Sequence, residues 1–231
     1  MGLREQNSEE RRQRILDCAR RMLAVEGSFD MRSLASQARV SVATLYNLFG
    51  NKDDIHLAIV RQGIASLAPL LEAERDQEPL IALEQLMQRP VEYLVQHAAV
   101  FRPILRLGYF EPERRGRPEV VALYAALVGV VEGILRSARE AGYLEASLPS
   151  QLLAAEVFYC YRSAIEDWAC REIDDEALAR RVQIGVGLVL FALARGAAKQ
   201  RLACRIEQLG APSLADLQAR FFQSSERSLS A

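Results

Sequence analysis

The sequence predicts an all-α protein in which a small amino-terminal helical unit precedes a larger helical domain. Glycine and proline are few, 13 and 8 among 231 residues, and apolar residues recur at helical spacing along most of the chain. No stretch shows the strict apolar/polar alternation of a strand. Half of the residues are apolar and 26% are charged, which is typical of a globular protein.

The first fifty residues are expected to form a compact three-helix unit. From Ser8 the apolar positions fall on one helical face until Gly27, which is typical of a helix end. Asp30 and Ser41 are typical amino-terminal caps of two short helices that follow, and Asn51 is typical of the start of a long one. The apolar face of the first helix is formed by Ile15, Leu16, Ala19, Met22 and Leu23.

Longer helices are expected in the rest of the chain, separated by breaks rich in charge, glycine or proline. Pro90 is expected to kink the first of them. The expected helices span residues 79–99, 101–107, 119–141, 150–170, 174–194, 196–208 and 213–222, with loops at 72–79 and 109–118. These elements predict a domain over residues 1–52, a second over 53–223 and a disordered tail over 224–231.

Several function classes are disfavoured by the sequence. The uninterrupted apolar runs 120–131 and 184–194 are too short to span a bilayer, and the polar amino terminus lacks a secretory signal, so a cytoplasmic protein is expected. The four cysteines form no CxxC pair and are expected to be small buried residues, and the two histidines do not complete a zinc site. No common catalytic or nucleotide-binding motif occurs, so neither a cofactor nor a metal is expected.

Residues 31–49 have the pattern of a helix-turn-helix. Leu34, Ala38, Val40, Leu45 and Leu48 are expected to face inward. A capped second helix with small and polar residues exposed at its start fits the major groove of B-DNA. An ordinary helical hairpin within a bundle is the alternative for the pattern taken alone. The residues expected to face outward are Arg32, Val42, Ala43, Thr44, Tyr46 and Asn47.

The segment GSFDMRSLASQARVSVATLYNLFGNKDDIHLAIV resembles the amino-terminal domain of the TetR family of transcriptional regulators. The match rests on Leu34-Ala35, Ala38 through Ser41, Thr44-Leu45-Tyr46, Phe49 and Lys52, and it covers about a quarter of the chain. Arg39 departs from the family pattern, because it stands in the turn where glycine is usual and a positive φ is often needed. Either the turn is altered there, or Arg39 tolerates the strain and reaches a phosphate.

The resemblance implies DNA contacts residue by residue. Arg32 matches a position that can read a base edge, for which a solvated arginine is the alternative. Thr44 and Tyr46 would bind phosphate through their hydroxyls, although Tyr46 could instead be a core residue, and Lys52 would bind phosphate at a helix start. The basic residues of the amino-terminal segment, Arg4, Arg11, Arg12 and Arg14, would add attraction. The candidate DNA-binding residues are Arg32, Ser41, Val42, Ala43, Thr44, Tyr46, Asn47 and Lys52.

The resemblance also implies a homodimer on palindromic double-stranded DNA, formed through the last two long helices. The sequence agrees, because residues 150–170 and 174–194 carry more apolar surface than one helix face needs; completion of a monomeric core is the alternative. The apolar or small residues expected at this interface are Leu153, Val157, Tyr161, Ala164, Trp168, Ile184, Gly185, Gly187, Leu188 and Ala192.

A small-molecule inducer is expected among the middle helices, and the preferred function is a ligand-responsive repressor. A regulator without an inducer, or an activator, is the first alternative, and an all-helical enzyme is a remote one because no catalytic constellation is present. The polar or aromatic candidates for the ligand site are Tyr93, His97, Arg102, Arg106, Tyr124, Tyr159 and Trp168.

Overall fold

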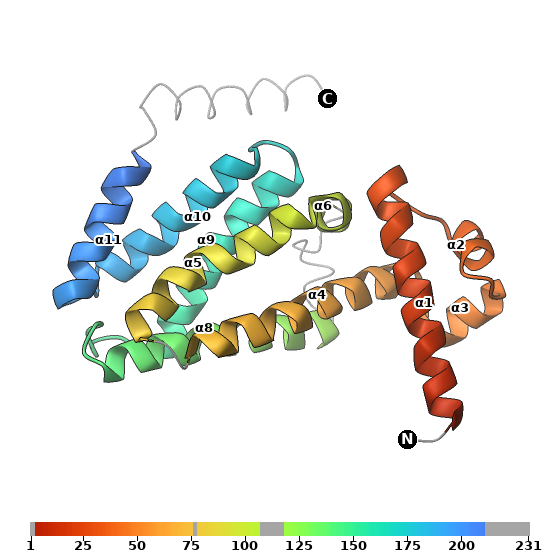
Figure 1. Ribbon diagram of the computed structural model, residues 1–231, viewed down its shortest axis with the longest axis horizontal. Helices are drawn as coiled ribbons and strands as arrows, with labels where there is room; N and C mark the ends of the chain where they lie inside the picture. The colour runs from red at the N-terminus through yellow and green to blue at the C-terminus, as the bar shows by residue number, and fades with distance from the viewer. Residues whose placement is uncertain (1–2, 76–77, 107–117, 211–231) are drawn as a thin grey trace.

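The computed structural model describes residues 3–75, 78–106 and 118–210 and is helical throughout, as expected (Figure 1). Within these residues the pairing of extended backbone is a single bridge between Leu144 and Ala194. The helices are α1 (Leu3–Glu26), α2 (Met31–Gln37), α3 (Val42–Phe49), α4 (Lys52–Arg75), α5 (Pro79–Gln96), α6 (Ala98–Arg106), α8 (Pro118–Glu140), α9 (Ser150–Ala169), α10 (Asp175–Phe191) and α11 (Gly196–Leu209).

The short helices begin where the sequence predicts. The Asp30 carboxylate accepts hydrogen bonds from the main-chain N–H groups of Arg32 and Ser33, and the Ser41 hydroxyl accepts one from the Thr44 N–H. Ahead of α4, Asn51 and Asp54 cap each other, since each side chain accepts from the other residue's main-chain N–H at 3.0–3.1 Å. Local hydrogen bonds therefore fix the starts of α2, α3 and α4.

The amino-terminal unit, α1 to α3 with the first turns of α4, has its own apolar core. Ile15, Ala19, Leu34 and Leu45 are fully buried in it, as the helical periodicity predicts. Figure 1 shows this unit at one end of the molecule, with α4 running from it into the larger unit. Because α4 also contributes Ile55, Leu57 and Ile59 to this core, the helix belongs to both units.

The larger unit consists of α5, α6, α8, α9, α10 and α11 with the remainder of α4. Its helices pack in sequence, α8 against α9, α9 against α10 and α10 against α11, while α5 packs against α4, α8 and α10. Trp168 lies fully buried at its centre with Ile134, Val157 and Val186. Such a core buries an apolar face of each long helix, which is the main source of stability in a helical domain.

Three expectations about helix boundaries are corrected. Helix α4 continues to Arg75, so the charged segment expected to be a loop from residue 72 begins as helix. The helix containing Pro90 ends at Gln96 instead of residue 99, and α6 follows after His97. The expected loop over 109–118 lies outside the described residues except for Pro118, which begins α8, and the expected helix 213–222 and tail 224–231 lie wholly outside them.

Helix α8 is longer than the uninterrupted apolar run 120–131 on which the sequence argument rests. In the described part of the chain, residues Val120–Glu140 are long and apolar enough to span a bilayer by length and composition alone. A few polar residues are compatible with a membrane span, so a helix can meet this criterion even where its longest uninterrupted apolar run is short. In the structure this helix packs against α9, α5 and α4.

Candidate nucleic-acid interface and ligand cavity

The outward surface of α2 and α3 contains most of the expected DNA-contacting residues. Arg32, Ala43, Tyr46 and Asn47 are exposed, and Tyr46 retains 52% of its surface, so the structure does not place it in the core. Val42 was expected to face outward but is half-buried, because it packs against the core of the amino-terminal unit. Its side chain therefore presents only part of its surface to a ligand.

Two hydroxyls of this surface are paired with each other. The Ser41 Oγ and the Thr44 Oγ1 lie 2.8 Å apart, in addition to the capping bond from the Thr44 N–H. Ser41 is exposed and Thr44 is half-buried. A hydroxyl has one proton and two acceptor positions, so either group can still bind a further partner.

The turn between α2 and α3 keeps its regular geometry in spite of Arg39. Arg39 has φ of 52°, its N–H donates to the Ser36 carbonyl at 3.1 Å, and the Val40 N–H donates to the Ala35 carbonyl at 3.0 Å. These two bonds form a Schellman motif, which requires a left-handed residue at this position. Arg39 thus tolerates the strained conformation, and of the two alternatives an altered turn is excluded.

Two arginines of α1 hold the hairpin in place. Arg12 donates to the Leu48 carbonyl at the end of α3, and its guanidinium lies 4.5 Å from the centre of the Phe49 ring. Arg14 donates to the Ala38 carbonyl at the end of α2 at 3.2 Å. Both cations therefore stabilise carboxyl-terminal ends of helices, where carbonyls lack partners. Their expected contribution to the attraction of DNA stays a prediction.

Lys52 lies at the first position of α4. Its side chain is half-buried, and the ammonium lies 5.1 Å from the centre of the Phe29 ring. This cation–π contact restricts the lysine beside the amino terminus of a helix, where an anion is also favoured.

The cap of α2 makes a pH-dependent contribution to stability. The hydrogen bond from the Ser33 hydroxyl, together with main-chain N–H groups, lowers the pKa of Asp30 below 3.8. A lowered folded-state pKa gives stabilisation that is complete above the unfolded value and is lost as the pH falls through the folded value. We expect Asp30→Asn, which keeps an acceptor but no charge, to melt below wild type at neutral pH. Thermal melts should show this difference shrinking below pH 3.8; a difference independent of pH would contradict the assignment.

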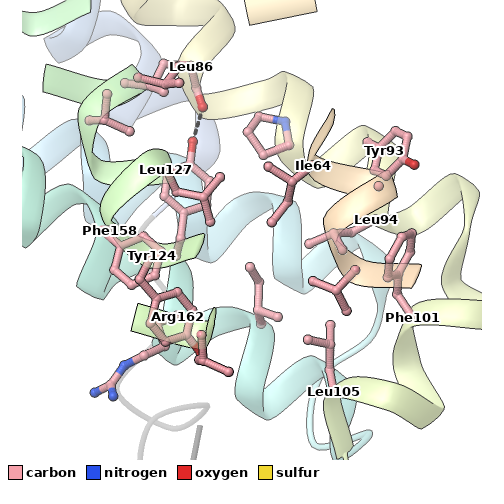
Figure 2. Close-up of a pocket in the computed structure, with 18 residues that line it drawn as sticks. Ile64, Leu86, Tyr93, Leu94, Phe101, Leu105, Tyr124, Leu127, Phe158 and Arg162 are labelled. Carbon is pink, nitrogen blue, oxygen red and sulfur yellow. Dashed lines mark hydrogen bonds between the residues drawn. The ribbon is translucent and has the colours of Figure 1, made fainter. Parts of the chain in front are cut away.

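The larger unit contains a cavity of about 170 Å³ between α4, α5, α6, α8 and α9 (Figure 2). Its wall is almost entirely apolar. The lining residues are Val60, Gly63, Ile64, Leu86, Pro90, Tyr93, Leu94, Phe101, Leu105, Val120, Tyr124, Leu127, Val130, Val131, Phe158, Tyr161, Arg162 and Ile165. A cavity of this kind is suited to an apolar ligand.

The structure brings two of the seven ligand candidates, Tyr93 and Tyr124, to this wall. His97 and Arg106 are exposed, and Tyr159 is an exposed residue of α9. These three lie outside the lining because they are exposed: His97 follows the end of α5, Arg106 ends α6, and Tyr159 lies on α9.

Arg102 and Trp168 are also absent from the lining, because both are engaged with Asp175. The Asp175 carboxylate accepts a hydrogen bond from each at 2.7 Å, and the Arg102 guanidinium lies 4.5 Å from the centre of the Trp168 ring. This cluster fixes α6 against α9 and α10. The lining residues that sequence reasoning missed are mostly aliphatic, and nothing in the sequence distinguishes an aliphatic residue beside a cavity from one in a packed core.

The cavity touches the core of the amino-terminal unit. Phe101 of α6 lines the cavity and also belongs to the apolar cluster of that unit, together with Ile104. On α4, Gly63 lies directly under the Phe101 ring, since a Cβ atom at Gly63 would come within 2.6 Å of it. Any displacement of Phe101 by a ligand would therefore press on the helix that enters the amino-terminal unit.

The expected dimer helices leave apolar residues exposed, but only part of the expected set is among them, namely Leu188 and Ala192. Leu153, Val157, Tyr161, Ala164 and Trp168 are buried within the chain, and Gly187 faces α11, where a Cβ atom would lie 3.4 Å from Ile206. The large apolar residues left exposed on α9 and α10 are Leu152, Tyr159 and Leu188.

Comparison with known proteins agrees with this architecture. Residues 15–59 match the family model described as bacterial regulatory proteins, tetR family. The solved structure of Thermus thermophilus FadR, a TetR-family repressor in complex with lauroyl-CoA, is similar over 80% of this chain and 97% of its own, with 22% identity and a TM-score of 0.65. No curated protein matched.

Two further solved structures have the same fold. SmeT, the repressor of a Stenotrophomonas maltophilia multidrug efflux pump, has 20% identity and a TM-score of 0.63 over 81% of this chain and 92% of its own. Bacillus subtilis FadR in complex with stearoyl-CoA has 18% identity and a TM-score of 0.61 over 77% of this chain and 97% of its own. Residues 15–59, which include the capped hairpin described above, thus match the amino-terminal domain of the tetR family of bacterial regulatory proteins, and the described chain shares the fold of solved TetR-family regulators.

Proposed function

We propose that this regulator is a homodimeric repressor that a small apolar ligand releases from a palindromic operator. The observation that carries the proposal is Phe101, which belongs both to the cavity wall and to the core of the amino-terminal unit. A ligand releases DNA only if it binds better to a conformation in which the recognition helices no longer fit successive major grooves. Because Phe101 contacts both the cavity and the core of the amino-terminal unit, a ligand in the cavity can change the position of the recognition helix.

The proposal divides the chain into a DNA-binding domain over residues 1–52 and a regulatory and dimerisation domain over 53–223. The first turns of α4 serve both, because Ile55 and Ile59 are buried in the core of the first domain. A single short recognition helix reads few base pairs, so two copies are needed for adequate affinity. The exposed Leu152, Tyr159 and Leu188 on α9 and α10 support a dimer interface on that face.

An apolar ligand is supported by the cavity wall and by the relatives. Two solved relatives hold acyl-CoA molecules, and a third represses a multidrug efflux pump. The test is a selection of bound DNA sequences with the full chain, followed by titration of the selected duplex with acyl-CoA and hydrophobic drugs. We expect an inverted repeat and at least one compound that both raises the melting temperature and releases the duplex. If no compound that binds the cavity changes the affinity for the duplex, induction by a cavity ligand is contradicted.

The DNA-contacting residues should separate into two kinds of effect. We expect Lys52→Ala to weaken binding on all sequences alike and to reduce the salt dependence by about one unit of slope, because one phosphate contact is lost. Arg32→Ala should cost roughly 1–3 kcal/mol on the selected site and little on random DNA. Gel-shift titrations at several salt concentrations measure both effects. Lys199→Ala, on α11, is the control; unchanged affinity for Lys52→Ala and Arg32→Ala would remove both assignments.

A further inference from the structure

Pro90 leaves one main-chain carbonyl of α5 without its usual partner. In an α-helix the carbonyl of residue i−4 accepts from the N–H of residue i, which for position 90 is the carbonyl of Leu86. Proline has no N–H, so the Leu86 carbonyl receives no such bond although α5 continues through this position to Gln96. Leu86 is 1% exposed, so water does not replace the missing donor.

Tyr161 of α9 supplies the missing donor. Its hydroxyl donates to the Leu86 carbonyl across the space between α5 and α9, and Figure 2 shows this bond at Leu86. Tyr161 is buried, which raises the pKa of its hydroxyl and keeps it protonated as a donor. Leu86, Pro90 and Tyr161 all line the cavity.

The hydrogen bond from Tyr161 to Leu86 joins two residues of the cavity wall, and without it this part of the wall would carry an unpaired carbonyl. Elsewhere, the Arg162 guanidinium points away from the cavity in Figure 2 and lies 5.2 Å from the centre of the Tyr159 ring. The Tyr93 hydroxyl lies against α4, 3.4 Å from the Cβ position of Gly63. Without Tyr161, the carbonyl of Leu86 would be an unsatisfied acceptor at the cavity wall, which is unfavourable when buried.

We propose that Tyr161 determines ligand specificity because its hydroxyl occupies the Leu86 carbonyl with a hydrogen bond. The cavity then selects molecules whose buried part is a hydrocarbon chain or an unsubstituted aromatic ring. This inference rests on the proposed function, because it takes the cavity as the ligand site. A ligand that buries a hydroxyl or amine beside Leu86 gives up hydrogen bonds to water and finds the Leu86 carbonyl already bonded to Tyr161. Removal of the Tyr161 hydroxyl leaves the Leu86 carbonyl free to accept a hydrogen bond from a ligand, so the preference should shift from apolar ligands toward ligands that carry a hydroxyl.

The test compares toluene and phenol, which have similar shape but differ in a methyl or hydroxyl group. An engineered apolar cavity of about 150 Å³ binds benzene, so probes of this size suit a cavity of about 170 Å³. In ligand-observed NMR titrations of the full chain, we expect Tyr161→Phe to shift the ratio of the two affinities toward phenol by roughly 2- to 10-fold. Tyr93→Phe removes a hydroxyl from the same wall without freeing a carbonyl and should leave the ratio unchanged.

A double variant tests the role of the carbonyl directly. Pro90→Ala restores an N–H that can bond to Leu86, so Pro90→Ala/Tyr161→Phe should return the ratio to the wild-type value. If Tyr161→Phe fails to fold, recovery of folding in the double variant supports the same role, and failure of both overturns it. An unchanged ratio in folded Tyr161→Phe also overturns the inference. A shifted ratio without release of DNA by any cavity ligand would instead contradict the proposed function alone.

Discussion

Leu188→Arg is expected to leave the regulator monomeric and to lower its operator affinity more than 100-fold. Leu188 lies on α10 with 52% of its surface exposed, and α10 packs against α9, on which Leu152 and Tyr159 are exposed. In a single chain the arginine would remain in water, so folding should be retained. In the proposed dimer the charge would be buried without a partner, at a cost of about 3 kcal/mol or more. Sedimentation velocity and gel-shift titration measure the two consequences.

Val25→Arg is the matched control for this prediction. Val25 is an apolar residue of α1 with 84% of its surface exposed, and it lies outside the proposed dimer face. The same chemical change there should leave the sedimentation coefficient at the dimer value. If the Leu188→Arg variant remains dimeric, the interface does not lie on this face of α9 and α10. Gly187→Arg is unsuitable for this test because Gly187 is buried against Ile206 of α11, where arginine would disrupt the fold of each chain.

Gly63→Ala is expected to weaken operator binding in the absence of any ligand, by about 5- to 150-fold. The new methyl group would lie 2.6 Å from the Phe101 ring, so the ring or α4 must move. Phe101 is buried between the cavity and the amino-terminal core, and its displacement imitates the pressure that we propose for a ligand. Gel-shift titration without ligand measures the loss, and adding a cavity ligand should then change affinity less than in wild type.

Two variants separate this effect from a general effect of alanine. Gly129→Ala places a methyl group in open space on α8, so it should raise helix stability by up to about 1 kcal/mol and leave operator affinity unchanged. Gly63→Ala combined with Phe101→Leu gives the methyl group room and should recover much of the affinity. If the folded Gly63→Ala variant binds the operator as tightly as wild type, Phe101 does not couple the cavity to the amino-terminal unit.

The amino-terminal unit could be predicted closely because its signals are local. The Asp30 and Ser41 caps and the Asn51–Asp54 capping box each involve residues within three positions of one another. At Arg39 the resemblance left an altered turn and a tolerated positive φ as alternatives, and the structure shows the positive φ. The roles of Arg12 and Arg14 were not foreseen, because their carbonyl partners lie 36 and 24 residues further along the chain.

The sequence by itself determined the helical class, the positions of most helices and the helix-turn-helix over residues 31–49. Helix periodicity and capping are properties of neighbouring residues, so they can be read from the sequence. Only the tertiary structure decided which apolar faces are covered. Tyr161 and Trp168 were expected at a dimer interface but are buried within the chain, and Leu188 remains exposed. A ligand site among the middle helices is expected from the sequence, but the aliphatic lining of the cavity is not, because an aliphatic side chain has the same periodicity in a packed core and beside a void. Whether a face meets another helix, a ligand or a second chain depends on the placement of residues far apart in sequence, which only the packed fold establishes.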